Sequence, residues 1–163
     1  MEFKTTDLAD EFEDDPSLQM AEPIFRDFGG TIAFCGPIAT VKVFEDNVLV
    51  RSTLETPGEG RVLVVDGEGS TRCALMGDLV AQIACDSGWA GVVINGCVRD
   101  SGDIAKIAVG AKALATVPRR SKKGGKGTVD VPLAFAGVTF LPGNYLYADE
   151  DGILIAKRNL LAP

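Results

Sequence analysis

The stretch GWAGVVINGCVRDSGD, residues 88–103, places an arginine and two carboxylates directly after an apolar run. Residues 90–94 are small or β-branched and carry no charge, which is typical of a strand buried on both faces. Arg99, Asp100 and Asp103 follow this run. Such carboxylates suit a hard divalent ion, Mg²⁺ or Mn²⁺, because these ions prefer oxygen ligands and keep several waters. The guanidinium could then bind an anionic substrate oxygen through two hydrogen bonds.

A second candidate segment, GDLV at 77–80, begins a predicted helix earlier in the chain. The first N–H groups of a helix have no internal partner and carry partial positive charge, so they suit a carboxylate or a phosphate. Asp78 could equally be an ordinary N-cap, and Arg99 with Asp100 an exposed ion pair of little energy. Ligands of α/β proteins, however, bind at the carboxyl ends of strands, where both segments are expected. Their position therefore favours one shared site for a metal and an anionic substrate.

Histidine is absent, and the four cysteines form no C-x-x-C pair. This pattern argues against a structural zinc site and against a disulfide framework. The lack of histidine also removes the usual Ser-His and Cys-His nucleophilic schemes. Any metal must therefore be held by oxygen, and most of the cysteines are expected to be small buried side chains. The cysteines are Cys35, Cys73, Cys85 and Cys97.

The length of 163 residues predicts a single domain spanning residues 1–163, with 46% hydrophobic and 24% charged residues as in an ordinary folded protein. No apolar run approaches the roughly 18 residues that cross a bilayer, so no membrane contact is expected. The acidic segment 1–15 has neither the basic region nor the apolar region of a secretory signal. These features predict a cytoplasmic protein.

The net charge of −7 argues against direct binding of nucleic acid, which needs a basic surface to displace counterions from phosphates. The segment RRSKKGGKG, residues 119–127, is the exception. It could be a local patch for an anion or RNA, although a solvated glycine-rich loop is the favoured interpretation. It is not a P-loop, because Gly127 follows Lys126 where that motif has serine or threonine.

Turn and capping residues divide the chain into alternating elements. Helices are predicted within 5–14 (with Thr5 or Thr6 as cap), 45–60, 78–88 and 103–107. Strands are predicted at 31–36 and 38–44 as a pair, at 61–67, 71–77, 90–94 and 110–117, and as a β-rich segment over 130–156. The order is α/β in the middle and β-rich at both ends, which predicts a compact mixed α/β sandwich.

Five segments of the chain resemble the family that contains the regulator of ribonuclease activity A and the metal-dependent 4-hydroxy-4-methyl-2-oxoglutarate aldolases. They are FGG at 28–30, GPIATVKVFEDN at 36–47, GRVLVVDGEGS at 60–70, GWAGVVINGCVRD at 88–100 and GVTFLPGNYLYADEDGI at 137–153. The resemblance implies a single compact domain, a β/β/α swivelling-type sandwich similar to phosphohistidine domains. It also implies a homotrimer with sites at the subunit interfaces.

The catalytic members resemble one pattern: Asp or Gly, twenty residues, Arg-Asp, two residues, then Glu or Asp. Asp78, Arg99, Asp100 and Asp103 match every position. The resemblance implies that Asp100 ligates the metal, that Asp78 and Asp103 orient metal-bound waters, and that Arg99 binds the 2-oxo acid. The backbone N–H groups that would take the substrate carboxylate are those of Gly77, Asp78, Leu79 and Val80.

The function implied by this resemblance is a class II pyruvate aldolase that depends on Mg²⁺ or Mn²⁺. It would cleave 4-hydroxy-4-methyl-2-oxoglutarate and related 4-hydroxy-2-oxo acids to pyruvate, and it would decarboxylate oxaloacetate. The alternative is a non-catalytic regulator that binds and inhibits an RNase E-type endoribonuclease. Regulating members commonly lack the aspartate after the arginine, so Asp100 favours the enzyme.

Overall fold

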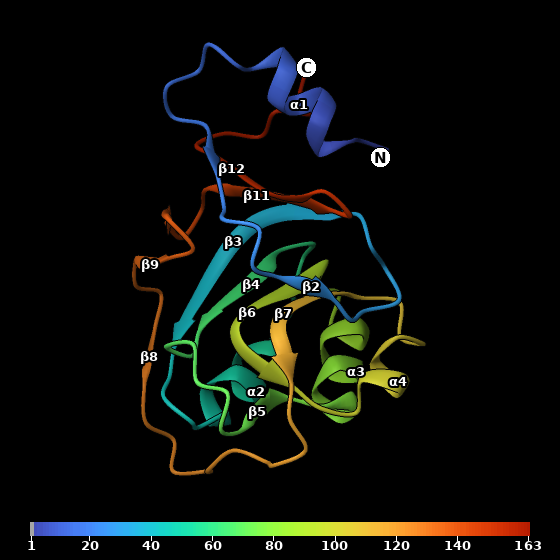
Figure 1. Ribbon diagram of the computed structural model, residues 1–163, viewed down its shortest axis with the longest axis vertical. Helices are drawn as coiled ribbons and strands as arrows, with labels where there is room; N and C mark the ends of the chain where they lie inside the picture. Colours follow the sequence, from blue (N-terminus) through green and yellow to red (C-terminus); the bar gives the residue numbers. More distant parts are fainter. Residues whose placement is uncertain (1) are drawn as a thin grey trace.

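A computed structural model describes residues 2–163, and its centre is a mixed β-sheet that curls around its own core (Figure 1). The main path of the sheet runs in the order β1-β12-β11-β3-β4-β6-β7-β2, with β5 beside β6 and β8 beside β3. The strands are β1 Gln19–Met20, β2 Arg26–Asp27, β3 Phe34–Lys42, β4 Val62–Asp66, β5 Ala74–Met76, β6 Gly91–Val98, β7 Gly110–Thr116, β8 Thr128–Val129, β9 Leu133–Phe135, β10 Val138–Phe140, β11 Tyr145–Asp149 and β12 Gly152–Ala156. The helices are α1 Thr5–Glu11, α2 Val48–Leu54, α3 Asp78–Asp86 and α4 Ser101–Ile104.

The parallel strands β3, β4, β6 and β7 form the middle of the sheet, and β5 adds to β6 in parallel. Strand β4 explains why these segments are apolar throughout, since its side chains alternate between two cores. Val62 and Val64 pack in one cluster with Phe140, whereas Leu63 and Val65 pack in the other. A strand covered on both faces has no solvent side, so it needs no polar alternation.

Helices α2, α3 and α4 cover one face of these parallel strands, and the β9–β10 hairpin and strands β11 and β12 contribute to the core on the other (Figure 1). The helical side buries Val50 and Leu54 from α2, Ala81 and Ala84 from α3, and Ile104 from α4. The result is a compact α/β fold with a mixed sheet, as predicted. No helix within residues 2–163 combines the length and the apolar character needed to span a membrane. All four cysteines are free, and Cys73 and Cys97 are buried.

Three sequence predictions of local structure are wrong. The segments predicted as a strand pair at 31–36 and 38–44 form the single strand β3, because Gly36 and Pro37 stay extended and pair with β11. Neither Thr5 nor Thr6 caps α1, whose N-cap is Lys4. The short helix predicted at 103–107 begins earlier, at residue 101, because the preceding aspartate takes a left-handed conformation and acts as its N-cap.

Helix α1 is fixed to the outer face of β11 and β12, near both chain termini (Figure 1). Leu8 packs with Tyr147 and Leu154 there. The buried Asp149 carboxylate accepts hydrogen bonds from the Thr5 hydroxyl at 2.6 Å and the Thr5 N–H at 2.7 Å. These bonds satisfy the first turn of the helix in place of a cap, which accounts for the missing threonine N-cap.

We expect Thr5→Val to lower the free energy of unfolding by about 1–3 kcal/mol, because the buried carboxylate loses its hydroxyl donor. Chemical denaturation at neutral pH measures the change. Thr6→Val is the matched control, since Thr6 is exposed in the same helical turn, and its effect should stay within about 0.5 kcal/mol. Equal losses in the two variants would contradict this account of Asp149.

The same contact makes stability depend on pH. Burial alone would raise the pKa of Asp149, but hydrogen bonds from Thr5, Asp151 and Gly152 lower the pKa below its usual value. A carboxyl with a lowered pKa stabilises the fold above its unfolded pKa of about 3.9, and this stabilisation is lost as the pH falls further. Asp149→Asn should therefore be less stable at neutral pH and show a flatter decline below about pH 4.

Candidate active site

The carboxyl ends of β5 and β6 bring the two predicted segments together. Met76 at the end of β5 is in register with Val98 at the end of β6. The Arg99 N–H donates to the Met76 carbonyl at 3.0 Å, which fixes the two strand exits against each other. Gly77 and the Arg99–Asp100 pair therefore lie side by side, as the sequence predicts for neighbouring parallel strands.

Asp100 is the centre of this arrangement. Its backbone is left-handed, with φ of 55°, a conformation that is uncommon outside glycine but that aspartate adopts more readily than most residues. Its Oδ2 atom lies 3.4 Å from the Asp78 nitrogen and 3.9 Å from Arg99 Nε, so both contacts are weak. A Cβ at Gly77 would lie 2.6 Å from the same oxygen. Glycine is thus required at position 77 for this carboxylate to approach the start of α3.

The first turn of α3 leaves a donor free. The Leu79 N–H donates to Asp78 Oδ1 at 2.9 Å, and the Ala81 N–H donates to the Gly77 carbonyl at 3.0 Å. Across the described part of the chain, no hydrogen-bond acceptor is found for the Val80 N–H. An unpaired N–H at the positive end of a helix can donate a hydrogen bond to a carboxylate oxygen of a ligand.

These groups line one groove of about 90 Å³. It contains Gly77, Asp78, Leu79, Val80, Arg99 and Asp100 from the predicted site. Asp103 does not line it: its side chain is 65% exposed and its Oδ1 lies 3.9 Å from the exposed Lys106. The structure therefore assembles the predicted residues with the exception of Asp103, which faces solvent.

The groove also contains residues that sequence analysis did not assign to a site. They come from the start of α2, from the first residue of β5 and from the basic loop 119–127, and they are Asn47, Arg51, Ala74, Arg120, Ser121 and Lys123. The basic loop is not simply a solvated segment, because its side chains form one wall of the groove. The only sequence signal for this role was the loop's excess of lysine and arginine, from which an anion-binding patch was the alternative to a solvated loop.

A buried carboxylate holds this basic loop in place. Asp46 Oδ2 accepts hydrogen bonds from the N–H groups of Gly124 at 2.7 Å and Gly125 at 2.9 Å, and Oδ1 accepts from Val48 at the start of α2. Burial alone would raise the pKa of Asp46, but these backbone donors outweigh it and lower the pKa. Asp46 therefore stays charged and joins the loop to α2.

Comparison with known proteins identifies the family. The family model described as RraA-like (Aldolase/RraA) matches residues 5–155. The chain belongs to the RraA-like family. A relative from Alkalilimnicola ehrlichii is 55% identical over 161 residues, which cover 99% of this chain and 99% of the relative. A relative from Aromatoleum aromaticum is 52% identical over 161 residues, which cover 99% of this chain and all of the relative (100%). Both carry the provisional name 4-hydroxy-4-methyl-2-oxoglutarate aldolase.

Two solved structures carry other names. The RNA-processing inhibitor RraA from Thermus thermophilis is 47% identical to this RraA-like chain with a TM-score of 0.92, covering 99% of this chain and 98% of the other. A protein from Geobacillus kaustophilus, described as an S-adenosylmethionine:2-dimethylmenaquinone methyltransferase, is 56% identical with a TM-score of 0.95, and 99% of each chain is covered. These similar proteins carry names for three different activities, so the groove itself must distinguish between them.

The donor set of the RraA-like groove fits a magnesium or manganese ion. Within residues 2–163, no three carboxylate or cysteine side chains gather closely enough to enclose a metal. Mg²⁺ does not need such a cage, because it binds through one or two carboxylates and completes its shell with water and substrate oxygens. Asp100 supplies one carboxylate, whose Oδ1 atom has no hydrogen-bond partner among the described residues, and Asp78 lies beside it.

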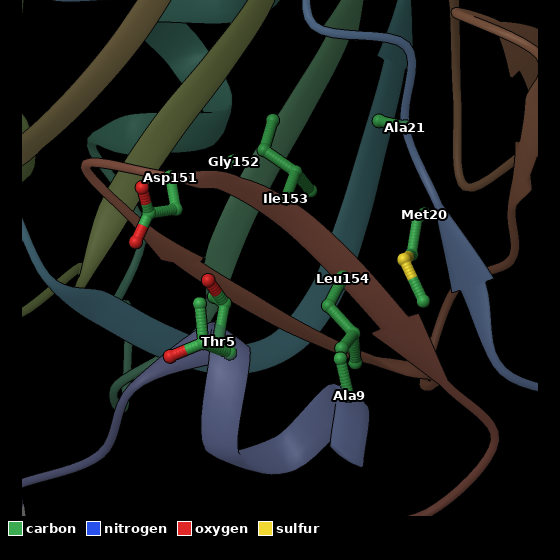
Figure 2. Close-up of a pocket in the computed structure, with 9 residues that line it drawn as sticks. Thr5, Ala9, Met20, Ala21, Asp151, Gly152, Ile153 and Leu154 are labelled. Carbon is green, nitrogen blue, oxygen red and sulfur yellow. The ribbon is translucent and has the colours of Figure 1, made fainter. Parts of the chain in front are cut away.

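A more apolar hollow of about 230 Å³ lies elsewhere, between α1 and strand β12 (Figure 2). Ala9, Ile153 and Leu154 contribute to its walls, and Asp151 at the β11–β12 turn is its one charged lining residue. Larger apolar hollows are the default candidates for ligand sites. Here, however, the polar side chains are Thr5, Thr6 and Asp151, and the Thr5 hydroxyl is already bonded to Asp149, so the groove at Asp100 is the better candidate.

Proposed function

We propose that this RraA-like protein is a divalent-metal-dependent carbon–carbon lyase that releases pyruvate from 4-hydroxy-4-methyl-2-oxoglutarate and related 4-hydroxy-2-oxo acids. The observation that carries the proposal is the Asp100 carboxylate, which shares one groove with the Arg99 guanidinium and the free Val80 N–H. This combination offers a metal ligand, a donor for a developing oxyanion and a donor for a carboxylate. The names of the relatives from Alkalilimnicola ehrlichii and Aromatoleum aromaticum support an aldolase.

Cleavage of such a substrate releases pyruvate as its enolate, so negative charge develops on the keto oxygen. A divalent ion held by Asp100, Mg²⁺ or Mn²⁺, would supply Lewis-acid polarisation of that oxygen. Arg99 would donate a charge-assisted hydrogen bond to the same atom, and donors aimed at developing charge are among the strongest contributions to catalysis. The N–H groups at the start of α3, Val80 above all, would orient the adjacent substrate carboxylate.

Cleavage also requires removal of the proton from the C4 hydroxyl. The sequence has no histidine to act as the base. Asp78 lines the groove, so its carboxylate would orient the water that accepts this proton. Asp103, paired with Lys106 outside the groove, would act on that water only from a distance. Decarboxylation of oxaloacetate needs the same enolate and no hydroxyl deprotonation, so we propose it as a second activity of the groove.

Three further features of the proposal rest on resemblance to the family. They are a swivelling-type, phosphohistidine-domain-like classification of the fold, a homotrimeric assembly, and a location in the cytoplasm. Leu79 is compatible with an assembly whose subunits meet at the groove, because this apolar side chain is 71% exposed at the mouth of the site.

Two other activities are alternatives to the lyase. A regulator of an RNase E-type endoribonuclease is the second candidate, supported by the likeness to the Thermus thermophilis inhibitor, and its protein partner would use surfaces outside the groove. A methyltransferase, the activity named for the Geobacillus kaustophilus structure, is the third candidate, and no feature of the groove favours it over the lyase.

Pyruvate release tests the proposal. The purified protein is incubated with 4-hydroxy-4-methyl-2-oxoglutarate and, separately, with oxaloacetate, with Mg²⁺ or Mn²⁺ or with a chelator. We expect turnover that requires the metal and exceeds the rate with metal alone. A folded protein that adds nothing to the metal-only rate for both substrates would refute the lyase, and binding to an RNase E-type endoribonuclease would then be measured.

A further inference from the structure

We infer that Arg120 binds the second carboxylate of the substrate, so that the groove selects dicarboxylic 2-oxo acids over monocarboxylic ones. The inference rests on the proposed function, because it assigns the opposite end of the same substrate. Arg99 and the start of α3 engage the 2-oxo acid end. A second cationic side chain in a groove of this size can reach the remaining charge of a short diacid.

The backbone places Arg120 firmly beside the site. Arg120 forms an isolated parallel bridge with Ala74, and the Ala74 N–H donates to the carbonyl of Arg119 at 2.8 Å. Ala74 begins β5, the strand that ends just before Gly77. The basic loop therefore runs along the strand that delivers the start of α3, and the Arg120 side chain lines the groove.

The Arg120 guanidinium has no carboxylate partner in the part of the chain that the structure describes. Other arginines near the groove are paired: Arg51 binds Glu55, and Arg72 binds Glu45. Lys123 donates to the Asn47 side chain, which leaves its charge without a counterion as well. A free guanidinium in a groove matches a carboxylate, which it can bind through two parallel hydrogen bonds.

The loop that carries Arg120 is pre-organised. Beyond the Asp46 carboxylate that binds Gly124 and Gly125, the Lys122 N–H donates to the Glu45 carbonyl at 2.8 Å, and the Asn47 N–H donates to the Lys122 carbonyl at 3.3 Å. Together with the hydrogen bond between Ala74 and Arg119, these contacts fix the loop on both sides of Arg120 without a ligand. Binding then costs less ordering of the backbone, which favours affinity and selectivity.

Two unreactive ligands test the assignment independently of turnover. 2-Oxoglutarate and 2-oxopentanoate share a five-carbon chain and a 2-oxo acid end, and they differ in a carboxylate or a methyl group at C5. Calorimetry with Mg²⁺ should give tighter binding of 2-oxoglutarate. Arg120→Gln should raise the dissociation constant of 2-oxoglutarate about 10- to 100-fold, the range of a charge-assisted hydrogen bond. The dissociation constant of 2-oxopentanoate should change by less than about twofold. Arg119→Gln is the matched control, because Arg119 is adjacent and does not line the groove.

Cleavage gives the second readout. 4-Hydroxy-2-oxoglutarate and 4-hydroxy-2-oxopentanoate differ in the carboxylate or methyl group on C4. Arg120→Gln should lower kcat/KM for the diacid alone. Wild-type protein that cleaves both substrates equally, or a variant that loses both equally, would overturn the role of Arg120 and leave the lyase standing. If neither substrate is cleaved but 2-oxoglutarate binding still depends on Arg120, the lyase is refuted and the diacid subsite is retained. If 2-oxoglutarate binding is unchanged in Arg120→Gln, the subsite is overturned.

Discussion

Asp100→Asn should reduce metal-dependent pyruvate release by at least about 100-fold, because a neutral amide replaces the one carboxylate that lies between Arg99 and the start of α3. Asparagine keeps the shape of the side chain and tolerates the left-handed backbone that this position requires. The loss should therefore reflect metal binding rather than folding. Pyruvate formation at saturating Mg²⁺ measures it, together with the Mn²⁺ dissociation constant.

Asp103→Asn is the comparison variant for Asp100→Asn, because it removes a carboxylate outside the groove. Asp103→Asn removes a carboxylate at a 65% exposed position outside the groove, and we expect a loss of less than about tenfold, since it can act only through solvent. If Asp103→Asn and Asp100→Asn lose activity equally, the groove described here is not the complete site. Full activity in Asp100→Asn would exclude Asp100 as the metal ligand.

Arg99→Gln should lower kcat about 100- to 1,000-fold, the range observed when one donor to a developing oxyanion is removed. The effect should fall mainly on kcat rather than KM, because the enolate oxygen carries its charge only in the transition state. Steady-state kinetics with 4-hydroxy-4-methyl-2-oxoglutarate separate the two parameters.

Two related variants sharpen the prediction for Arg99. Arg99→Lys keeps the positive charge but loses the planar pair of donors, so it should recover only part of the rate. Arg119→Gln removes an arginine that lies outside the groove, and its kcat should be unchanged. A rise in KM with normal kcat in Arg99→Gln would assign Arg99 to ground-state binding of the substrate instead.

The strand-rich centre of the fold was predictable because its physical cause is local. A run such as Val62–Val65 is short, uncharged and rich in β-branched residues, which favours a strand with both faces covered. The meeting of Gly77 with Arg99 and Asp100 was predictable for a related reason: parallel neighbours end at the same edge of a sheet. Both inferences need only the sequence of each segment and the geometry of one sheet.

Other parts of the fold depend on partners that are distant in sequence. Gly36 and Pro37 read as a break between two strands, but pairing with β11, more than 100 residues later, keeps them extended. The basic loop 119–127 has no period of its own and is ordered by Asp46. Its contribution to the groove, Arg120 and Lys123, was therefore beyond a reading of local pattern. The exposure of Asp103 likewise follows from the tight turn of α4, which its spacing in the motif does not reveal.

Binding of oxalate, a planar dianion that resembles the pyruvate enolate, tests the central claim most directly. Calorimetric titration of oxalate into the protein with and without Mn²⁺ reports whether one groove holds the metal and the enolate together. We expect oxalate binding that requires Mn²⁺ and is lost in both Asp100→Asn and Arg99→Gln, while Arg119→Gln binds oxalate normally. Oxalate binding that is independent of Mn²⁺, or unchanged in the Asp100 and Arg99 variants, would contradict it.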